Sequence, residues 1–253
     1  MSIALDFSGK TALITGASQG IGAQMARTFH AAGANVWLNH PDFGSTRADS
    51  EKIAVELNAK RAGSAFVVAA DVADAAAVQR MMAEIKQSAG GIDFLINNAA
   101  ILRDRTVAKM SLDDWQAVMD VNLTGAFHCC RFGLEIMRDG GAVVSMGSIS
   151  AILGLFGQAN YAAAKGGVTA LMRVLSRECA KRNIRANAIA PGVIETSMAA
   201  TIPEKARAEM LKQVALGRFG KPEEIANVAL FLCSPLASYV TGQTIEVNGG
   251  WRG

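Results

Sequence analysis

Tyr161 and Lys165 are separated by four positions in this chain of 253 residues, which holds only two tyrosines. In a helix that spacing puts both side chains on one face. A nearby ammonium favours the phenolate, so we expect Lys165 to lower the pKa of the phenol toward the range useful for proton transfer. Ser148 follows a predicted strand, at the edge where open parallel sheets bind ligands. A solvated or capping lysine beside a tyrosine at the core edge is the alternative.

A glycine-rich segment, Gly16-Ala17-Ser18-Gln19-Gly20-Ile21-Gly22, joins the first predicted strand to the first predicted helix. Glycines permit a tight turn and a close approach to a pyrophosphate, and the helix N-terminus favours its charge. This pattern indicates a dinucleotide site, with an ordinary glycine-rich turn as the alternative. No Gly-Lys-Ser/Thr follows, which excludes a Walker A loop.

The end of the second predicted strand, Asn39-His40-Pro41-Asp42, bears on the choice of dinucleotide. An acidic residue there would bind the ribose hydroxyls and repel a 2′-phosphate. Because the first two residues are not acidic, NADP(H) is not excluded, but neither the glycine loop nor the positions directly after the strand supply an Arg or Lys. These residues leave the choice between the two cofactors open; we favour NADP(H) and keep NAD(H) as the alternative. Ser18, Asn39 and His40 could donate to a phosphate, whereas Asp42 would oppose it. For His40 alone we favour an ordinary histidine of a surface turn.

These groups must be positioned by short apolar strands that alternate with stretches of helical period. The expected strands are 10–15, 35–39, 64–70, 93–97, 142–146, 184–190 and 244–247. The expected helices are 21–32, 46–62, 73–88, 111–137, 161–182 and 222–233, with a short helix at 203–214. This alternation predicts an α/β fold: a single-domain, doubly wound parallel sheet of Rossmann type, with about seven strands and helices on both faces. The domain would span 1–253, and the long connection at about 192–217 would be a lid over the substrate.

The composition excludes several classes of protein. The net charge of +3, from 25 basic and 22 acidic residues, is too balanced for a dedicated nucleic-acid binder. The four cysteines have no C-x-x-C spacing, which argues against a metal site and fits a reduced interior; we read Cys129 and Cys130 as core. No basic stretch followed by an apolar run begins the sequence, and no run is long enough to span a membrane. We therefore expect a cytoplasmic protein that binds neither membrane nor metal.

In combination, these motifs resemble the short-chain dehydrogenase/reductase family over nearly the full length. The resemblance rests on residues that stand in family order: Thr15-Gly16-x-x-x-Gly20-x-Gly22, Asp71-Val72, Asn97-Asn98-Ala99, Asn122, Ser148, Tyr161-x-x-x-Lys165 and Pro191-Gly192. It implies an enzyme that transfers hydride between a nicotinamide cofactor and a carbonyl or secondary alcohol.

The resemblance also implies a role for each residue. Tyr161 would exchange the proton of the substrate oxygen, and Ser148 would polarise that oxygen. Lys165 would lower the pKa of Tyr161 and bind the nicotinamide ribose, and Asn122 would hold a water that links Lys165 to solvent. The cofactor would contact Gly16, Ser18, Gln19, Gly20, Ile21, Gly22, Asn39, His40, Asp71, Val72, Asn98, Ala99, Tyr161, Lys165, Pro191, Gly192, Ile194 and Thr196.

Local segments, among them 157–167 and 191–196, are most similar to those of 3-oxoacyl-[acyl-carrier-protein] reductases and acetoacetyl-CoA reductases. The implied substrate is a 3-oxoacyl thioester. Polyol, sugar and other secondary-alcohol dehydrogenases share such segments and remain the alternative. A cofactor-binding regulatory protein without turnover is the alternative from another class, which the complete Ser-Tyr-Lys-Asn set disfavours.

The resemblance implies partners as well. Arg173, Arg177 and Lys181 recur every four residues, and with Arg182 they could form a basic patch for an acidic carrier protein. A solvated or intersubunit ion-pair face is the alternative. The family is often tetrameric, so we expect a homotetramer in which Trp251 and the surrounding segment 249–253 contact a neighbouring subunit.

Overall fold

Seven parallel strands form a single twisted sheet in the computed structural model, which describes residues 5–197 and 199–251. The strands are β1 (Thr11–Ile14), β2 (Asn35–His40), β3 (Ala65–Ala69), β4 (Ile92–Asn97), β5 (Met137–Met146), β6 (Arg185–Pro191) and β7 (Thr244–Val247). Their order across the sheet is β3-β2-β1-β4-β5-β6-β7. The strand order reverses between β1 and β4, which is where a doubly wound sheet opens a ligand crevice.

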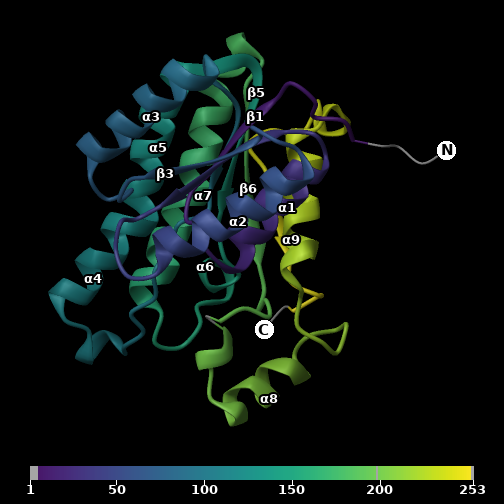
Figure 1. Cartoon of the computed structure of the whole chain (residues 1–253). Coiled ribbons are helices and arrows are strands. Elements are labelled where there is room, and N and C mark those ends of the chain that lie inside the picture. The colour runs from purple at the N-terminus through teal and green to yellow at the C-terminus, as the bar shows by residue number, and fades with distance from the viewer. Residues whose placement is uncertain (1–4, 198, 252–253) are drawn as a thin grey trace.

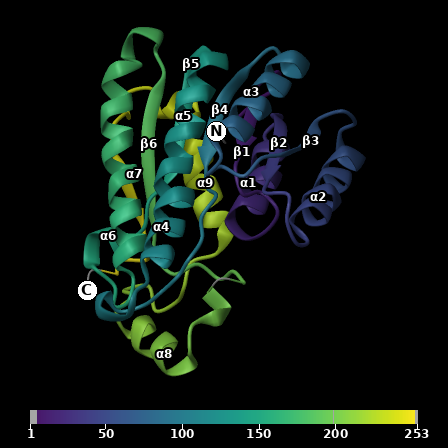
Figure 2. The ribbon, with the colours of Figure 1, turned by 90° about the vertical axis from the view of Figure 1, so that its left-hand side faces the viewer.

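Helices cover both faces of the sheet (Figures 1 and 2). One face carries α1 (Gly20–Ala31), α2 (Thr46–Lys60) and α9 (Pro222–Cys233), and the other carries α3 (Ala75–Ala89), α5 (Gly125–Ile136) and α7 (Ala159–Glu178). Each face buries its own apolar cluster against the sheet, whose central strands β1 and β4 are wholly buried. The predicted single-domain, doubly wound fold is confirmed.

The expected helix 111–137 is wrong in its interior and at its end. It consists of α4 (Leu112–Met119), a π-helical turn η2 (Asp120–Thr124) and α5, and β5 already begins at Met137. The π turn inserts a residue that shifts the face of the helix, a change that hydrophobic periodicity does not reveal. Arg138 lengthens β5 because it reaches the buried Asp93, with 2.7 Å between guanidinium and carboxylate.

The long connection after β6 contains a short 3-10 turn, η4 (Ala199–Thr201), and α8 (Glu204–Lys212). This segment lies beyond the carboxyl edge of the sheet, at the bottom of Figure 1. A short helix that the sequence did not predict, α6 (Ser150–Leu153), follows β5 on the same side of the molecule. Both flank the edge where the candidate catalytic residues gather.

Trp251 packs inside its own chain, which corrects the expectation that it contacts a neighbouring subunit. Its side chain is 2% exposed and forms a third apolar cluster with Ile149, Val214 and Phe219. The two glycines before it adopt left-handed backbone conformations that turn the tail back onto the segment after α8. Arg252 and Gly253 lie outside the described residues, as do residues 1–4.

None of the described helices is long and apolar enough to cross a membrane. Within residues 5–197 and 199–251, no group of three or more His, Cys, Asp or Glu side chains is arranged to hold a metal ion.

Candidate active site

The predicted site residues converge because they follow the carboxyl ends of neighbouring parallel strands. Gly16 follows β1, Asn39 and His40 end β2, Asn98 follows β4, and Ser148 follows β5. The remaining predicted positions follow β3 (Asp71 and Val72) or end and follow β6 (Pro191, Gly192, Ile194 and Thr196), and Tyr161 and Lys165 lie in the first turns of α7.

The glycine loop is shaped to admit a phosphate. Gly16 has φ +61°, and a Cβ there would lie 2.8 Å from the Cα of Ala99; one on Gly22 would lie 2.5 Å from the Asn98 amide nitrogen. Helix α1 begins at Gly20 without a side-chain cap and without an acidic residue in its first turn. Its N-terminal N–H groups are therefore available for an anion, and the loop fits a dinucleotide pyrophosphate.

Two polar residues hold the glycine loop against β4. The Asn98 side chain donates to the carbonyl oxygens of Thr15 (2.9 Å) and Gly16 (3.0 Å). The Thr15 hydroxyl accepts from the backbone N–H groups of Asn98 (2.9 Å) and Ala99 (3.0 Å). The donors of Asn98 are thus used within the chain, which makes it a support of the loop.

The end of β2 is buried. The Asn39 amide donates to the Ala70 carbonyl (3.0 Å) and accepts weakly from Gly16 N–H (3.4 Å). His40 is 1% exposed, and its Nδ1 lies 3.0 Å from the Pro41 carbonyl oxygen, so its interpretation as a surface-turn histidine is wrong. Asn39 and His40 are therefore both buried, whereas Asp42 is exposed.

The other predicted cofactor residues enclose the site from both sides. Asp71 is exposed, whereas Val72 is buried against Gly125 of α5. On the far side, the Pro191 carbonyl accepts from Ile149 N–H (3.0 Å), so β6 is joined directly to the residue after Ser148. Thr196 lies over the glycine loop, 3.5 Å from where a Cβ on Gly20 would stand, and Ser197 donates to the exposed Gln19 (3.3 Å).

Ser148, Tyr161 and Lys165 form one contiguous group. The half-buried Tyr161 phenol interacts with Ser148, and Lys165 Nζ lies 5.6 Å from the centre of the Tyr161 ring. Lys165 is 2% exposed and donates to the Met146 carbonyl at the end of β5 (2.8 Å). The helical spacing of the pair therefore has the predicted geometric consequence.

The expectation for the tyrosine pKa is not met in the chain by itself. Burial raises the pKa of Tyr161 to about 12, opposed in part by the Ser148 hydrogen bond. Burial also lowers the pKa of Lys165 to about 8. Both shifts favour the neutral form of the group, as transfer from water into a poorly solvated site does. Lys165 is not among the causes of the Tyr161 shift.

Two asparagines fix this group, and sequence reasoning missed one of them. Asn122, in the π turn, accepts from Ile101 N–H (2.9 Å) and donates to the Ile101 carbonyl (3.0 Å). Asn160 is fully buried, accepts from Tyr161 N–H (2.8 Å) and donates to the carbonyl of Asp114 in α4 (3.2 Å). Its place before Tyr161 was the only available signal, since its partners are backbone atoms distant in sequence.

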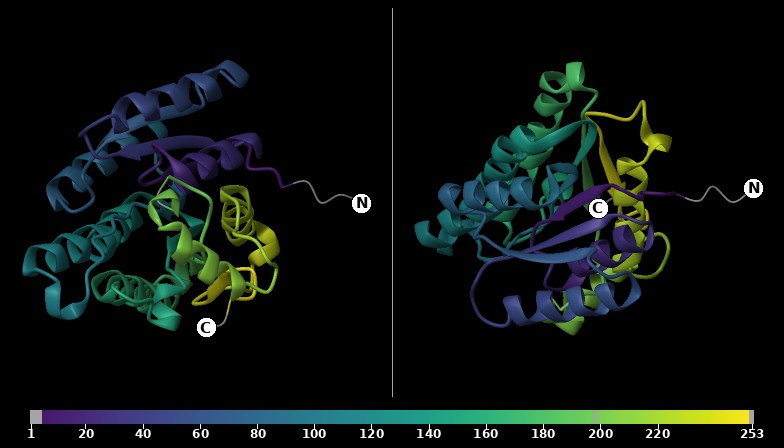
Figure 3. Two further views of the ribbon diagram at one scale, coloured as in Figure 1. Left: turned by 90° about the horizontal axis from the view of Figure 1, so that it is seen from below. Right: turned by 45° about the horizontal axis from the view of Figure 1, so that its top comes forward.

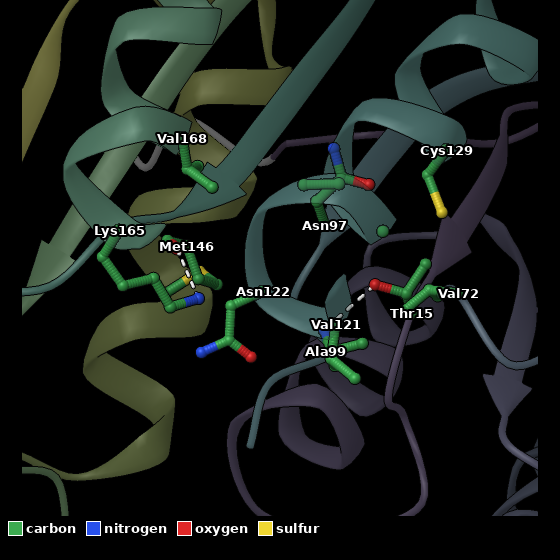
Figure 4. A pocket seen from close by; sticks show the side chains of 12 residues that line it. Thr15, Val72, Asn97, Ala99, Val121, Asn122, Cys129, Met146, Lys165 and Val168 are labelled. Carbon is green, nitrogen blue, oxygen red and sulfur yellow. Dashed lines mark hydrogen bonds between the residues drawn. The ribbon is translucent and has the colours of Figure 1, made fainter. Parts of the chain in front are cut away.

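A small cavity lies behind Lys165 (Figure 4). Its volume is about 10 Å³, room for a single water molecule, and Lys165, Asn122 and Asn97 are among its lining residues. The buried Asn97 Oδ1 has no hydrogen-bond partner among the described residues. The cavity thus offers polar groups to a water beside the lysine.

Comparison with known proteins agrees with this geometry. A family model described as Enoyl-(Acyl carrier protein) reductase matches residues 16–252. The 3-oxoacyl-[acyl-carrier-protein] reductase FabG of Aquifex aeolicus (strain VF5) is 40% identical over 248 residues, 97% of this chain and 98% of that protein. FabG of Thermotoga maritima is 42% identical over 244 residues, 96% of this chain and 97% of that protein. A solved Brucella melitensis structure, of a protein named short-chain dehydrogenase/reductase SDR:Glucose/ribitol dehydrogenase, has a TM-score of 0.93 at 37% identity and covers 99% of this chain and 100% of its own.

The chain belongs to the short-chain dehydrogenase/reductase family. A further structure of similar fold, a blue fluorescent protein from a metagenomic library in complex with NADPH, has a TM-score of 0.93 at 32% identity over 98% of this chain and 100% of its own. As a short-chain dehydrogenase/reductase, the protein is an oxidoreductase that uses a nicotinamide cofactor.

One predicted partner contact of this short-chain dehydrogenase/reductase also has partners within the chain. Arg182 donates to Asp139 (2.8 Å), to the Leu134 carbonyl (2.8 Å) and to the Met137 carbonyl, so its guanidinium holds the start of β5. Its side chain is 40% exposed, and its part in a basic patch stays a prediction. Arg173, Arg177 and Lys181 are exposed on α7 and the turn after it.

Proposed function

We propose that this oxidoreductase reduces a 3-oxoacyl thioester with NADPH. The observation that carries the proposal is the apolar character of the surface that adjoins Ser148. Ile149, Leu153 and Leu155 follow the serine and pack in one cluster with Met210 and Leu211 around the end of α8. An acyl chain is stabilised beside such side chains, whereas a polyol would leave its hydroxyl groups without partners. The names of the relatives at 40% identity support the same substrate class.

The bound nicotinamide would supply the hydride to the carbonyl carbon. Ser148 donates a hydrogen bond to the carbonyl oxygen and so stabilises the negative charge that develops there. Tyr161 transfers its proton to that oxygen, and the raised pKa supports this direction because the phenol is protonated at neutral pH. Lys165 and the adjoining cavity with Asn122 return a proton to the phenolate.

The preference for NADPH is supported by the lack of an acidic side chain in the last two residues of β2, since neither Asn39 nor His40 is acidic. Asp42, after the strand, would oppose a 2′-phosphate. Arg47, in the first turn of α2, lies near Asp42 but pairs with Glu51 (3.0 Å). The proposed cofactor contacts are Tyr161, Lys165 and residues 16, 18–22, 39–40, 71–72, 98–99, 191–192, 194 and 196.

An acyl carrier protein is the proposed carrier of the thioester, and Arg173, Arg177 and Lys181 are its proposed contacts. Sixteen residues of helix separate Tyr161 from Arg177, a rise of about 24 Å. The acyl group would therefore have to reach the site on an extended arm. Charge reversal at the three positions should raise the KM for the acyl-carrier substrate and leave that for the CoA thioester unchanged.

A homotetramer is proposed from two apolar surfaces. Leu112, Trp115 and Phe127 are exposed on α4 and α5, whereas Leu236 and Tyr239 are exposed beyond α9. The two regions lie on opposite sides of the molecule (Figure 3). Exposed apolar groups of this size mark interaction surfaces, and two different self-complementary faces build a tetramer of dihedral symmetry.

A cytoplasmic location is proposed because all four cysteines are buried free thiols.

A polyol or sugar dehydrogenase is the second candidate, favoured by the name of the Brucella melitensis protein, which includes glucose/ribitol dehydrogenase. The deciding experiment measures NADPH and NADH oxidation with acetoacetyl-CoA and longer 3-oxoacyl thioesters, and NADP and NAD reduction with ribitol and glucose. We expect turnover with thioesters and NADPH. Alcohol-dependent reduction without thioester turnover would replace the proposal with the second candidate, and no turnover in any combination would point to the non-catalytic alternative.

A further inference from the structure

We propose that Trp251 is a positioning residue that clamps the lid segment 192–217 to the segment carrying Ser148. Its effect on catalysis rests on the proposed function, whereas its effect on the lid does not. The indole Nε1 donates to Gln213 (2.9 Å), the residue directly after α8. The indole is also buried in one cluster with Ile149, directly after Ser148, and with Val214 and Phe219.

The chain before Trp251 is shaped to press the indole against the lid. Asn248 follows β7 and donates to the Trp251 carbonyl (3.0 Å), while its own side-chain oxygen accepts from Gly250 N–H (3.0 Å). Gly249 has φ +66°, and its carbonyl accepts from Leu216 N–H (3.0 Å). A Cβ on Gly250 would lie 2.8 Å from that of Ala215. The tail and the segment 213–216 therefore pack at backbone distance.

Among the described residues, few other side-chain contacts hold the lid. Helix α8 has no buried residue of its own. Before the helix, the segment is tied to the glycine loop by the Ser197–Gln19 hydrogen bond. The Arg207 guanidinium lies 4.7 Å from the Phe219 ring and 3.5 Å from the Glu195 carboxylate. Glu195 belongs to the lid segment itself, and Phe219 lies two residues beyond its end. Partly buried Met210 and Leu211 reach the cluster that Trp251 completes.

Holding the lid in place affects both the binding of the acyl chain and the packing of the segment after Ser148. When the lid is held, Met210 and Leu211 stay beside the apolar surface after Ser148, and water is excluded from the acyl site. When the indole is lost, the cluster that joins Val214, after the carboxyl end of α8, to Ile149 loses its largest side chain. Lid opening should therefore become more frequent and acyl binding weaker, while the glycine loop keeps its shape.

The test compares Trp251→Ala and Trp251→Phe with wild-type protein by limited trypsin digestion in saturating NADPH. Lys205 and Lys212 are exposed cleavage sites in α8. We expect Trp251→Ala to speed cleavage there by at least about tenfold, because local opening becomes easier. Trp37→Phe and Trp37→Ala are the matched controls, since Trp37 is equally buried in the sheet and stacks on Phe66, distant from the lid.

Kinetics supply the second readout. For Trp251→Ala we expect the KM for a 3-oxoacyl thioester to rise at least about tenfold, with kcat and the NADPH dissociation constant changing less than about threefold. Trp251→Phe and Gln213→Ala remove the two ends of one hydrogen bond, so their effects on cleavage should not add in the double variant.

Unchanged cleavage in Trp251→Ala, or acceleration equal to that in Trp37→Ala, would overturn the clamp. Should Trp251→Ala fail to fold, Trp251→Phe and the Gln213→Ala cycle decide the question, and additive effects there count against it. Should the wild-type enzyme prove inactive on thioesters, the proposed function fails while cleavage and NADPH binding still decide the clamp.

Discussion

Tyr161 and Lys165 share one poorly solvated site, and burial moves their pKa values in opposite directions: up to about 12 for the phenol and down to about 8 for the ammonium. Each shift favours a neutral group. Without a bound cofactor, the Tyr161 phenol is therefore protonated near neutral pH, as the acid in a carbonyl reduction should be. Lys165 titrates in a range where it can pass a proton to the phenolate.

Tyr161→Phe tests the phenol as the acid. The variant keeps the ring, its packing and Lys165, and loses only the hydroxyl. We expect kcat for thioester reduction to fall by about 10² to 10⁴-fold, the range for loss of a general acid. NADPH binding, followed by nicotinamide fluorescence, should stay within about twofold. The fully exposed Tyr239 gives the matched control, Tyr239→Phe, with wild-type kinetics. A Tyr161→Phe enzyme of normal rate would refute the assignment.

Lys165→Met tests the lowered lysine pKa through stability. Between pH 8 and 10.5 the unfolded chain keeps a proton that the folded chain has released, so the free energy of unfolding of the wild type rises with pH there. Relative to Lys165→Met, we expect a rise of roughly 3 kcal/mol across this window, since each pKa unit corresponds to 1.36 kcal/mol. Below pH 8 the difference should be flat.

Urea unfolding of both proteins at several pH values measures that difference. Lys181→Met, at an exposed lysine, is the control and should show no such slope. A constant difference between wild type and Lys165→Met from pH 7 to 10.5 would mean that the lysine keeps an ordinary pKa.

At the residue scale, the sequence indicated the groups that we propose do the chemistry and missed residues that hold the structure around them. Ser148, Tyr161 and Lys165 are recognisable by type and spacing. Asn160 and Gln213 act through contacts with atoms distant in sequence: Asn160 with the backbone carbonyls of Arg103 and Asp114, and Gln213 with the indole of Trp251. Such contacts depend on tertiary packing, and the residue types alone do not distinguish them from ordinary surface amides.

At the scale of elements, all seven strands were predictable because buried parallel strands are short apolar runs between turns. The π turn η2 was not, since the apolar pattern runs across it from α4 into α5. Nor was the early start of β5, where Arg-Asp-Gly-Gly looks like a turn but Arg138 is drawn into the sheet by Asp93. Tertiary contacts override local propensity at both places.

The glycine loop allows a prediction at this scale through paired substitutions. Gly16 and Gly63 have similar left-handed φ values, +61° and +66°. Alanine at either should cost about 1–2 kcal/mol in backbone strain. Only at Gly16 would the new methyl also collide with Ala99, because nothing lies within 4 Å of a Cβ on Gly63.

We therefore expect Gly16→Ala to weaken NADPH binding at least about tenfold, a change of 1.4 kcal/mol or more. Gly63→Ala should bind NADPH as the wild type does, with a similar loss of stability in urea unfolding. Equal NADPH affinity in the two variants would show that the close approach of the loop to β4 is not required.

At the scale of the whole molecule, the sheet separates two independent apolar clusters, and a third, smaller cluster joins the lid to the edge where the site lies. The two large clusters were foreseeable from periodicity. The third was not, because it assembles Ile149, Val214, Phe219 and Trp251 from separate segments of the chain. This arrangement leaves the catalytic edge with a core of its own, stabilised by few side chains.

The proposed tetramer is tested by placing charges on its two apolar surfaces. Leu112→Glu with Trp115→Glu places charge on the α4 surface, and Leu236→Glu with Tyr239→Glu places it beyond α9. A charge buried in an apolar interface is strongly unfavourable, so each pair should halve the mass measured by light scattering, and the two pairs together should give a monomer. Val55→Glu, at a residue 70% exposed on α2, is the control and should remain tetrameric. A wild-type protein that is monomeric, or a tetramer that survives all four substitutions, would contradict the two-surface assembly.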